Sequence, residues 1–495
     1  NEGVIKSEFK NPANALFDFI DKIVDEKKFH QELNDDVSIS LYLFTNFGAS
    51  PEIELYQIPD TVFYFYRFCH KLSYKNEWLE PNDPYASRSQ SENFSWRLIN
   101  KIDFNKTFAD AHNVMVTGVY EAEASEGWSL NGTGKKMPLP DLASYYTIGL
   151  SNEQSTSSGY GKSSRVAYMG RLNYNYKSRY YITASYRVDG KSGPENRVEE
   201  NKFGAFPSFA ASWRLSEEPF MQANGIFDNL KFRAGWGQTG NPSPFVYTTM
   251  DSNNYDYGIG ANVLGYVPGT PANPLLKWET TTQIDLGVDI MTLDGKLSVS
   301  FDYFDKLTHD LLTLQELPVY SGYGDDGSYL INLGEVSNKG YELTIDYTPV
   351  QTRNFFWDVN FNISTVKNKV LDLGNQAAFM TGTSGNGMLS EDTYRVQEDL
   401  PLGTMWGYKY LGIWQESEAE QAAEYGNVPG DYKYEDVNGD GAYNLQDDGQ
   451  AIGDANPDFV WAFNNNISYK DFDFSLLLQG MQGQDLFNLA RAAMS

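Results

Sequence analysis

The feature that most constrains this chain is an alternation of apolar and polar residues that recurs in about a dozen segments. Between Arg179 and Asp189, even positions carry Tyr, Ile, Ala, Tyr and Val, whereas odd positions end in Ser, Arg and Asp. Because successive side chains of a strand point to opposite faces, this pattern predicts a strand with one apolar and one polar face. The same pattern predicts strands at 94–104, 113–121, 165–176, 209–215, 230–236, 282–290, 297–303, 341–347, 357–364, 459–469 and 472–479.

The connections between these strands alternate between short and long. Tight turns are expected at 176–179, 293–296 and 470–471, and the Asp294-Gly295 pair suits a hairpin turn with positive φ. Short turns alternating with long loops are typical of an outer-membrane barrel, and the strands approach the ~10 residues that cross a membrane. Soluble sandwiches have strands of only ~5–6 residues. The polar stretches expected as loops are 121–160, 189–205, 238–275 and 305–338.

Composition supports strands and argues against membrane helices. The 34 Tyr and 30 Phe residues suit pleated, half-buried surfaces. The mean hydropathy is −0.49, and no uncharged apolar run reaches the ~18 residues that a spanning helix needs. Alternating barrel strands have a hydropathy that resembles that of soluble proteins. The expected fold class is therefore all-β: a transmembrane antiparallel β-barrel with long extracellular loops, wider than the narrow eight-stranded class.

Several function classes are disfavoured. A net charge of −28 would repel the phosphates of a nucleic acid. The sole cysteine, Cys69, excludes an internal disulfide framework, and the four histidines are scattered. Neither a nucleophile elbow nor a phosphate loop nor a histidine dyad is found. The adjacent carboxylates Asp325-Asp326 and Asp447-Asp448 point apart in an extended chain. We therefore expect no enzyme activity and no organic cofactor.

The first ninety residues follow a different pattern. Apolar residues at helical spacing predict an amphipathic helix over 13–33, and the aromatic stretch 62–69 is a candidate strand. The start at Asn1 lacks the basic and apolar regions of a signal peptide, so we expect a mature chain or a fragment. The predicted organisation is an unassigned segment of helix and strands at 1–90, followed by the barrel and its loops at 91–495.

A series of ordered motifs carries a family resemblance. Any one of them is weak, but their order is specific: from about Ser95 to its end, the chain resembles the SusC/RagA-type TonB-dependent transporters of Bacteroidetes. The motifs are YMGRLNY at 168–174, RYYITASYRVDG at 179–190, FPS at 206–208, SWRL at 212–215, LKFRAGWGQTGN at 230–241, NPLLKWE at 273–279, NLGEVSNKGYE at 332–342, GYKYLGIW at 407–414 and DVNGDG at 436–441.

The resemblance implies a barrel of about 22 strands when complete, in contact with outer-membrane lipid. It also implies a SusD-like surface lipoprotein that captures substrate. Transport would be driven by energy that TonB delivers. The cargo would be a glycan or oligosaccharide, or a peptide, and pairs of transporter and lipoprotein could form a dimer. Members carry a plug and a TonB box before the barrel, which we do not recognise here. Because the end at 493–495 is not an aromatic-ended strand, we expect an incomplete chain.

One acidic stretch matches the template of a calcium-binding loop. Positions 1, 3 and 5 carry oxygen ligands, position 6 is Gly441 and position 12 is acidic. Asp447 at position 12 is shorter than the usual Glu, and an acidic turn without an ion remains the alternative. A bound Ca²⁺ would be structural, because it would neutralise a repulsive loop. The predicted ligands are Asp436, Asn438, Asp440, Ala442, Asn444 and Asp447.

Aromatic residues in the expected loops are candidate substrate contacts. Tyrosine rings stack on sugars, although packing within the loops is the simpler interpretation. Two other functional classes stay open beside an importer: a passive porin or structural barrel of the envelope, and a soluble secreted carbohydrate-binding β-protein. The candidate substrate-binding residues are Tyr255, Tyr257, Tyr266, Tyr320 and Tyr323.

Overall fold

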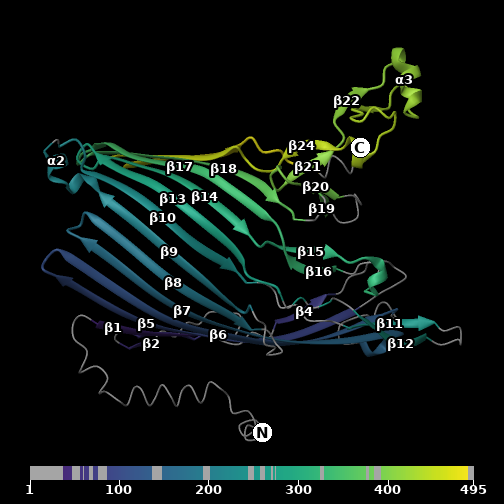
Figure 1. Cartoon of the computed structure of the whole chain (residues 1–495), viewed down its shortest axis with the longest axis horizontal. Coiled ribbons are helices and arrows are strands. Elements are labelled where there is room, and N and C mark those ends of the chain that lie inside the picture. Colours follow the sequence, from purple (N-terminus) through teal and green to yellow (C-terminus); the bar gives the residue numbers. More distant parts are fainter. Residues whose placement is uncertain are drawn as a thin grey trace, which may run out of the picture. The chain divides into compact units, whose positions relative to one another are not determined.

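The computed structural model consists mainly of long, mostly antiparallel β-strands (Figure 1). By its internal contacts the chain divides into two compact units, 1–174 and 175–495. The helix expected at 13–33 lies outside the described residues. The structure describes residues 37–46, 56–58, 61–65, 71–75, 86–136, 148–192, 201–223, 225–242, 250–256, 262–268, 271, 273, 275–323, 328–374, 378–383 and 392–488.

The first unit is a sheet with the strand order β2-β3-β1-β5-β6-β7, and β4 also pairs with β5. Strands β5 and β6 pair along their whole length, from Ala86 opposite Gly134 to Phe108 opposite His112. Strand β5 runs across residue 90. The predicted division into 1–90 and 91–495 stays a prediction. The strands are β1 (Val37–Asn46), β2 (Tyr56–Ile58), β3 (Thr61–Phe65), β4 (Lys71–Lys75), β5 (Ala86–Phe108), β6 (His112–Lys135) and β7 (Glu153–Tyr176, whose last two residues belong to the second unit).

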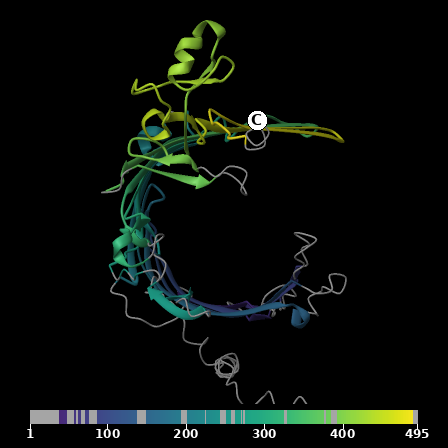
Figure 2. The same ribbon diagram turned by 90° about the vertical axis from the view of Figure 1, so that its right-hand side faces the viewer.

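The second unit contains a sheet of nine strands in chain order, each antiparallel to its neighbours. Figure 2 shows that this sheet is curved. Its strands are β8 (Tyr180–Ser192), β9 (Phe203–Arg214), β10 (Asn229–Asn241), β13 (Glu279–Thr292), β14 (Leu297–His309), β17 (Glu335–Gln351), β18 (Phe355–Asp372), β25 (Phe459–Tyr469) and β26 (Phe472–Gln482).

Every one of the twelve strand segments predicted from alternation is confirmed, and most of the strands are longer than predicted. The tight turns are confirmed as well. Asp294 and Gly295 have φ of 55° and 76°, as a tight hairpin turn requires, and Lys470 has φ of 53°. Apart from the longer connection 215–228, short turns join the strands of the second unit at one end, and connections such as 373–458 join them at the other.

The expectation that the long polar stretches are loops is wrong in part. Strand β6 continues to Lys135 and β7 begins at Glu153, inside the stretch 121–160. Where both faces of a strand meet water, the alternation disappears while the backbone hydrogen bonds continue, so the pattern ends before the strand does. Two other stretches contain their own hairpins: β11 (Met250–Asp256) with β12 (Asn262–Pro268), and β15 (Leu312–Glu316) with β16 (Ser328–Asn332).

The longest connection of the second unit carries most of the remaining elements. Residues 404–458 are called the outer module below, and its β22 and α3 lie beyond the ends of the long strands (Figure 1). The elements are β19 (Phe379–Thr383), β20 (Asp392–Val396), β21 (Thr404–Gly407), β22 (Tyr410–Ile413), α3 (Ala419–Glu424), β23 (Tyr432–Tyr434), α4 (Leu445–Asp448) and β24 (Gln450–Asp454), with α2 (Pro219–Gln222) between β9 and β10, and the 3₁₀ turns η2 (Ile148–Leu150), η3 (Leu215–Glu217), η4 (Val319–Ser321) and η5 (Glu416–Glu418).

The strand register aligns apolar residues into rows on one face of the second unit's sheet. Phe232, Val288, Phe301 and Leu343 are successive partners across four strands. Such side chains are exposed to the surroundings; Leu286, for example, is 49% exposed. A continuous exposed apolar face of this extent is unusual for a soluble protein and typical of a lipid-facing barrel wall. Within the described residues, no helix is long and apolar enough to cross a bilayer.

Candidate functional site

The opposite face of the same sheet is polar and centres on Arg233 of β10. Its guanidinium Nε and Nη2 donate to the two carboxylate oxygens of Asp289 on β13, each at 2.8 Å. It also reaches Asp302 on β14, with Nη1 at 2.9 Å from Oδ1, and the Ser300 hydroxyl at 3.1 Å. One arginine therefore joins three adjacent strands, and its planar fork suits the bidentate contact with Asp289.

A glycine on the middle strand makes this arrangement possible. Gly287 lies between Arg233 and Asp302 in the register. A Cβ atom at Gly287 would lie 2.7 Å from Cζ of Arg233, closer than real Cβ contacts allow. The side chain of Arg233 thus crosses over the bare backbone of β13, and any larger residue would block the path to Asp302.

Further polar contacts continue along this face. Gln283 donates to Asp285 at 2.6 Å, and Asn360 donates to Asp346 at 2.6 Å. A hollow of about 410 Å³ is lined by Thr183, Arg233, Asp285, Asp302 and Glu342, among others. Because most of these groups are charged, the face is suited to contact water or a polar cargo and unsuited to lipid.

The outer module has a small aromatic core of its own. Trp414 is only 3% exposed and lies 5.6 Å from Tyr425 between ring centroids, and Tyr425 stacks on Tyr443 at 4.9 Å. Ala422 of α3 is fully buried beside this core. Lys433 places its Nζ 4.3 Å from the Trp414 ring centroid. The module is therefore a packed structure and not a loose loop.

The acidic loop of this module is held together by hydrogen bonds from its own backbone. Asp436 accepts from the amides of Gly439 at 2.6 Å and Gly441 at 2.9 Å, and from the Tyr425 hydroxyl at 3.0 Å. The hydrogen bond from the Gly441 amide is the main reason why the pKa of Asp436 is held below its ordinary value. The carboxylate is thus ionised and suited to attract a cation.

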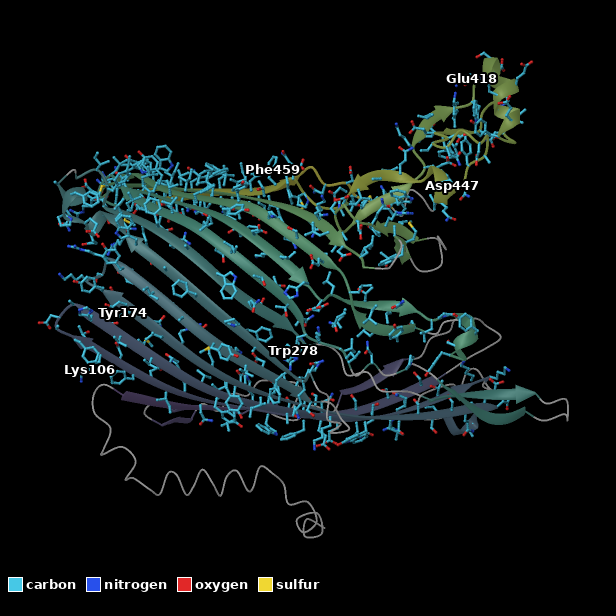
Figure 3. The ribbon with its side chains drawn as sticks, in the orientation of Figure 1. Lys106, Tyr174, Trp278, Glu418, Asp447 and Phe459 are labelled. Carbon is cyan, nitrogen blue, oxygen red and sulfur yellow. The ribbon has the colours of Figure 1, made fainter. Side chains whose placement is uncertain are left out.

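The residue that follows the predicted ligand Asp447 also holds the loop together. Asp448 is fully buried and accepts from the amides of Val437 at 2.9 Å and Asn444 at 2.8 Å. Asp447, the predicted ligand at position 12, is exposed and accepts from the Asn444 side chain at 3.0 Å. Figure 3 labels Asp447 and Glu418, which both lie in the outer module.

Comparison with known proteins decides the family. The family described as TonB dependent receptor-like, beta-barrel, matches residues 24–480. The chain belongs to this family. The localisation and fold expected from the sequence follow: this is a β-barrel chain of the bacterial outer membrane, of SusC type. The apolar rows therefore face lipid and the Arg233 face lines the barrel interior.

Relatives and solved structures agree with this assignment. TonB-dependent receptor P3 of Formosa agariphila is 33% identical over 394 residues, which are 79% of this chain and 39% of that receptor. TonB-dependent receptor SusC of Bacteroides thetaiotaomicron is 29% identical over 63% of this chain and 31% of SusC. A structure of the RagAB peptide transporter matches with a TM-score of 0.67 and 18% identity, covering 81% of this chain and 42% of that chain. The chain thus spans about two fifths or less of the length of these proteins.

The calcium assignment of the receptor's acidic loop stays a prediction. Asp436, Asn438, Asp440, Ala442, Asn444 and Asp447 do lie in one loop. The side-chain oxygens of Asp436, Asn438 and Asp440 accept from backbone amides, and Asp447 accepts from the side-chain amide of Asn444. In the described parts of the chain, no group of three or more His, Cys, Asp and Glu side chains is arranged to hold a metal ion. The buried Asp448 provides an internal closure that needs no cation.

If Ca²⁺ binds, it will protect the outer module from proteolysis. We expect 1 mM CaCl₂ to slow cleavage after Tyr443 and Leu445 in limited proteolysis with chymotrypsin, with the fragments identified by mass spectrometry. Asp440→Asn, which removes one predicted ligand charge but keeps the bond from the Ala442 amide, should abolish the effect. Equal cleavage with CaCl₂ and with EDTA would leave the ion-free acidic turn as the correct interpretation.

The tyrosines predicted to contact substrate fall on two separate hairpins of the receptor. Tyr255 and Tyr266 lie on β11 and β12, whereas Tyr257 lies outside the described residues. Tyr320 and Tyr323 lie between β15 and β16, and Tyr320 is 92% exposed. Their role stays a prediction. Sequence reasoning missed the Arg233 cluster and Asp448, whose partners become visible only through strand register and helix geometry.

Proposed function

We propose that this chain is the barrel portion of a TonB-dependent importer, which moves a bulky polar nutrient across the outer membrane together with a SusD-like surface lipoprotein. The observation that carries the proposal is the division of one sheet into two faces. The lipid side is apolar across consecutive strands, and the other side carries Arg233, Asp289 and Asp302 in a polar network. A wall built in this way separates lipid from a wet interior.

The cargo class within this proposal is a glycan or a peptide. The name of one structural neighbour, the RagAB peptide transporter, indicates a peptide cargo, and the resemblance to SusC/RagA-type transporters implies glycans as well. A polar, charged interior suits hydroxyl-rich sugars or peptide backbones, because both exchange hydrogen bonds with carboxylates and amides. Membership in the TonB-dependent receptor family supports active import, driven by TonB, over passive diffusion through a porin.

The test is TonB-dependent uptake and co-purification from native outer membranes. We expect the full-length receptor, extracted in mild detergent, to bring down a surface lipoprotein in stoichiometric amount, as identified by mass spectrometry. Deleting tonB should abolish uptake of the cargo that the neighbouring genes indicate, while leaving the amount of receptor unchanged. Uptake that persists without TonB, with no lipoprotein bound, would instead support a passive porin or a structural barrel.

A further inference from the structure

The outer module presents two tyrosines that its own core does not use. Tyr410 on β22 and Tyr432 on β23 are 57% and 58% exposed, and their ring centroids lie 5.9 Å apart with planes at 78°. A register shift between Tyr410 and Gly412, where Gly412 has φ of 124°, brings the two rings onto neighbouring positions. The pair therefore offers two ring faces at nearly a right angle to one another.

These exposed rings are supported by a chain of aromatic contacts that leads into the core. Tyr434 lies 6.4 Å from Tyr410 and 6.5 Å from Tyr432, and Tyr443 lies 5.5 Å from Tyr434. Tyr443 in turn stacks on Tyr425 beside the buried Trp414. A ligand that contacts the tyrosine pair would thus meet a preorganised surface and pay little ordering entropy.

The charge of the module restricts the ligand. Residues 404–458 contain twelve Asp and Glu but two Lys and no Arg, a net charge of −10. Both lysines are already engaged: Lys409 pairs with Glu435 at 3.0 Å and Lys433 with Glu418 at 2.7 Å. The module as a whole therefore carries an excess of carboxylates, which repels anionic ligands and attracts cations.

The module contains one positive charge that is held by an aromatic ring and a carboxylate together. Lys433 lies over the Trp414 ring while Glu418 binds its ammonium, so the positive charge meets an aromatic face and a carboxylate together. The exposed pair of Tyr410 and Tyr432 repeats the aromatic half of this arrangement within the same acidic module. A neutral sugar could stack on the rings, but the net charge of −10 would contribute nothing to its recognition.

We infer that Tyr410 and Tyr432 form a binding site for an Arg or Lys side chain of a peptide cargo. The guanidinium or ammonium group lies against the tyrosine faces, and the acidic surroundings of the module supply the attraction from a distance. The site narrows the cargo of the importer proposed above to peptides that carry basic residues, and in that sense rests on that proposal.

The test measures peptide binding to the purified full-length receptor. The probe is fluorescein-labelled Gly-Arg-Gly-Arg-Gly-Arg, and the control probe has Gln in place of Arg; both are followed by fluorescence polarisation at 50 and 300 mM NaCl. We expect tighter binding of the Arg peptide, weakened at high salt. Tyr410→Ala with Tyr432→Ala should weaken it roughly tenfold, because each ring contributes a cation–π contact.

Matched variants separate the site from general effects. Tyr410→Phe with Tyr432→Phe keeps both rings and should bind within about twofold of the natural receptor. Tyr160→Ala removes a tyrosine of strand β7 that is 62% exposed, and it should leave binding of the Arg peptide unchanged. Near-UV circular dichroism checks that the outer module stays folded in the alanine variant. Should it unfold, Tyr432→Ala alone is compared with Tyr432→Phe.

Two results would overturn the inference. The first is equal binding of the Arg and Gln peptides. The second is displacement of the Arg peptide by maltoheptaose, together with undiminished binding of maltoheptaose to the Phe variant, which would indicate a sugar site. Because peptide binding is measured without TonB, this experiment tests the binding site independently of the importer proposal. Loss of TonB dependence with intact peptide binding would refute import, whereas TonB-dependent uptake without Arg-selective binding would refute this site.

Discussion

Replacing Val288 with arginine is expected to destabilise the folded barrel by ~2–4 kcal/mol, the cost of a basic side chain facing lipid near the bilayer midplane. Val288 belongs to the apolar row of the second unit, four residues from Ile284. The row of Ile284 contains Asp305, which pairs with Lys339 at 2.8 Å, and this ion pair indicates where the apolar band ends. The turn at 293–296 limits the band on the other side, so Val288 lies near its middle.

The measurement is urea unfolding of the full-length receptor in phospholipid vesicles, followed by tryptophan fluorescence. Asn360→Arg is the matched control, since Asn360 lies on the polar face and donates to Asp346 at 2.6 Å. An arginine there gains an ion-pair partner and meets water, so its effect should stay below about 1 kcal/mol. A mild effect at Val288 combined with a severe effect at Asn360 would show that the two faces are assigned the wrong way round.

The strands could be predicted because lipid on one side and water on the other give a residue pattern with period two. Strand β25 was predicted with its observed bounds, 459–469, since its alternation runs to both ends. Strand β6 was predicted only over 113–121, although it continues to Lys135. Beyond Glu121 one face carries Ala122, Ala124, Glu126, Trp128 and Leu130, so the alternation is weak, and the hydrogen bonds that hold the strand to β5 leave no trace in the side-chain pattern.

The site residues were harder to predict, because they depend on distances that the alternation does not contain. Arg233 lies 56 residues before Asp289 and 69 before Asp302, and only the register of β10, β13 and β14 brings them together. In the Asp447-Asp448 doublet, the short helix α4 turns the second carboxylate inward. A linear template with fixed positions cannot decide between two adjacent acids.

Replacing Arg233 with methionine should destabilise the barrel by roughly 1–3 kcal/mol, less than the full cost of breaking a buried ion pair. The side chains of Arg233, Asp289 and Asp302 are 35%, 32% and 28% exposed, so water screens part of the charge. Methionine keeps much of the length of the side chain but leaves two carboxylates facing each other across Gly287. The loss should therefore come from unpaired charge more than from lost packing, and it should be measurable by the same urea titration.

Two further variants isolate that cause. Adding Asp289→Asn and Asp302→Asn to Arg233→Met removes the unpaired charges, so the triple variant should recover most of the stability of the natural chain. Lys101→Met is the matched control: Lys101 pairs with Asp103 at 2.7 Å, and both residues lie on the single strand β5. Because this ion pair joins two residues of one strand, its loss should cost less than the loss of Arg233. Equal costs for Lys101→Met and Arg233→Met, with no recovery in the triple variant, would mean that Arg233 does not act by joining β10, β13 and β14, and that backbone pairing alone holds this part of the wall.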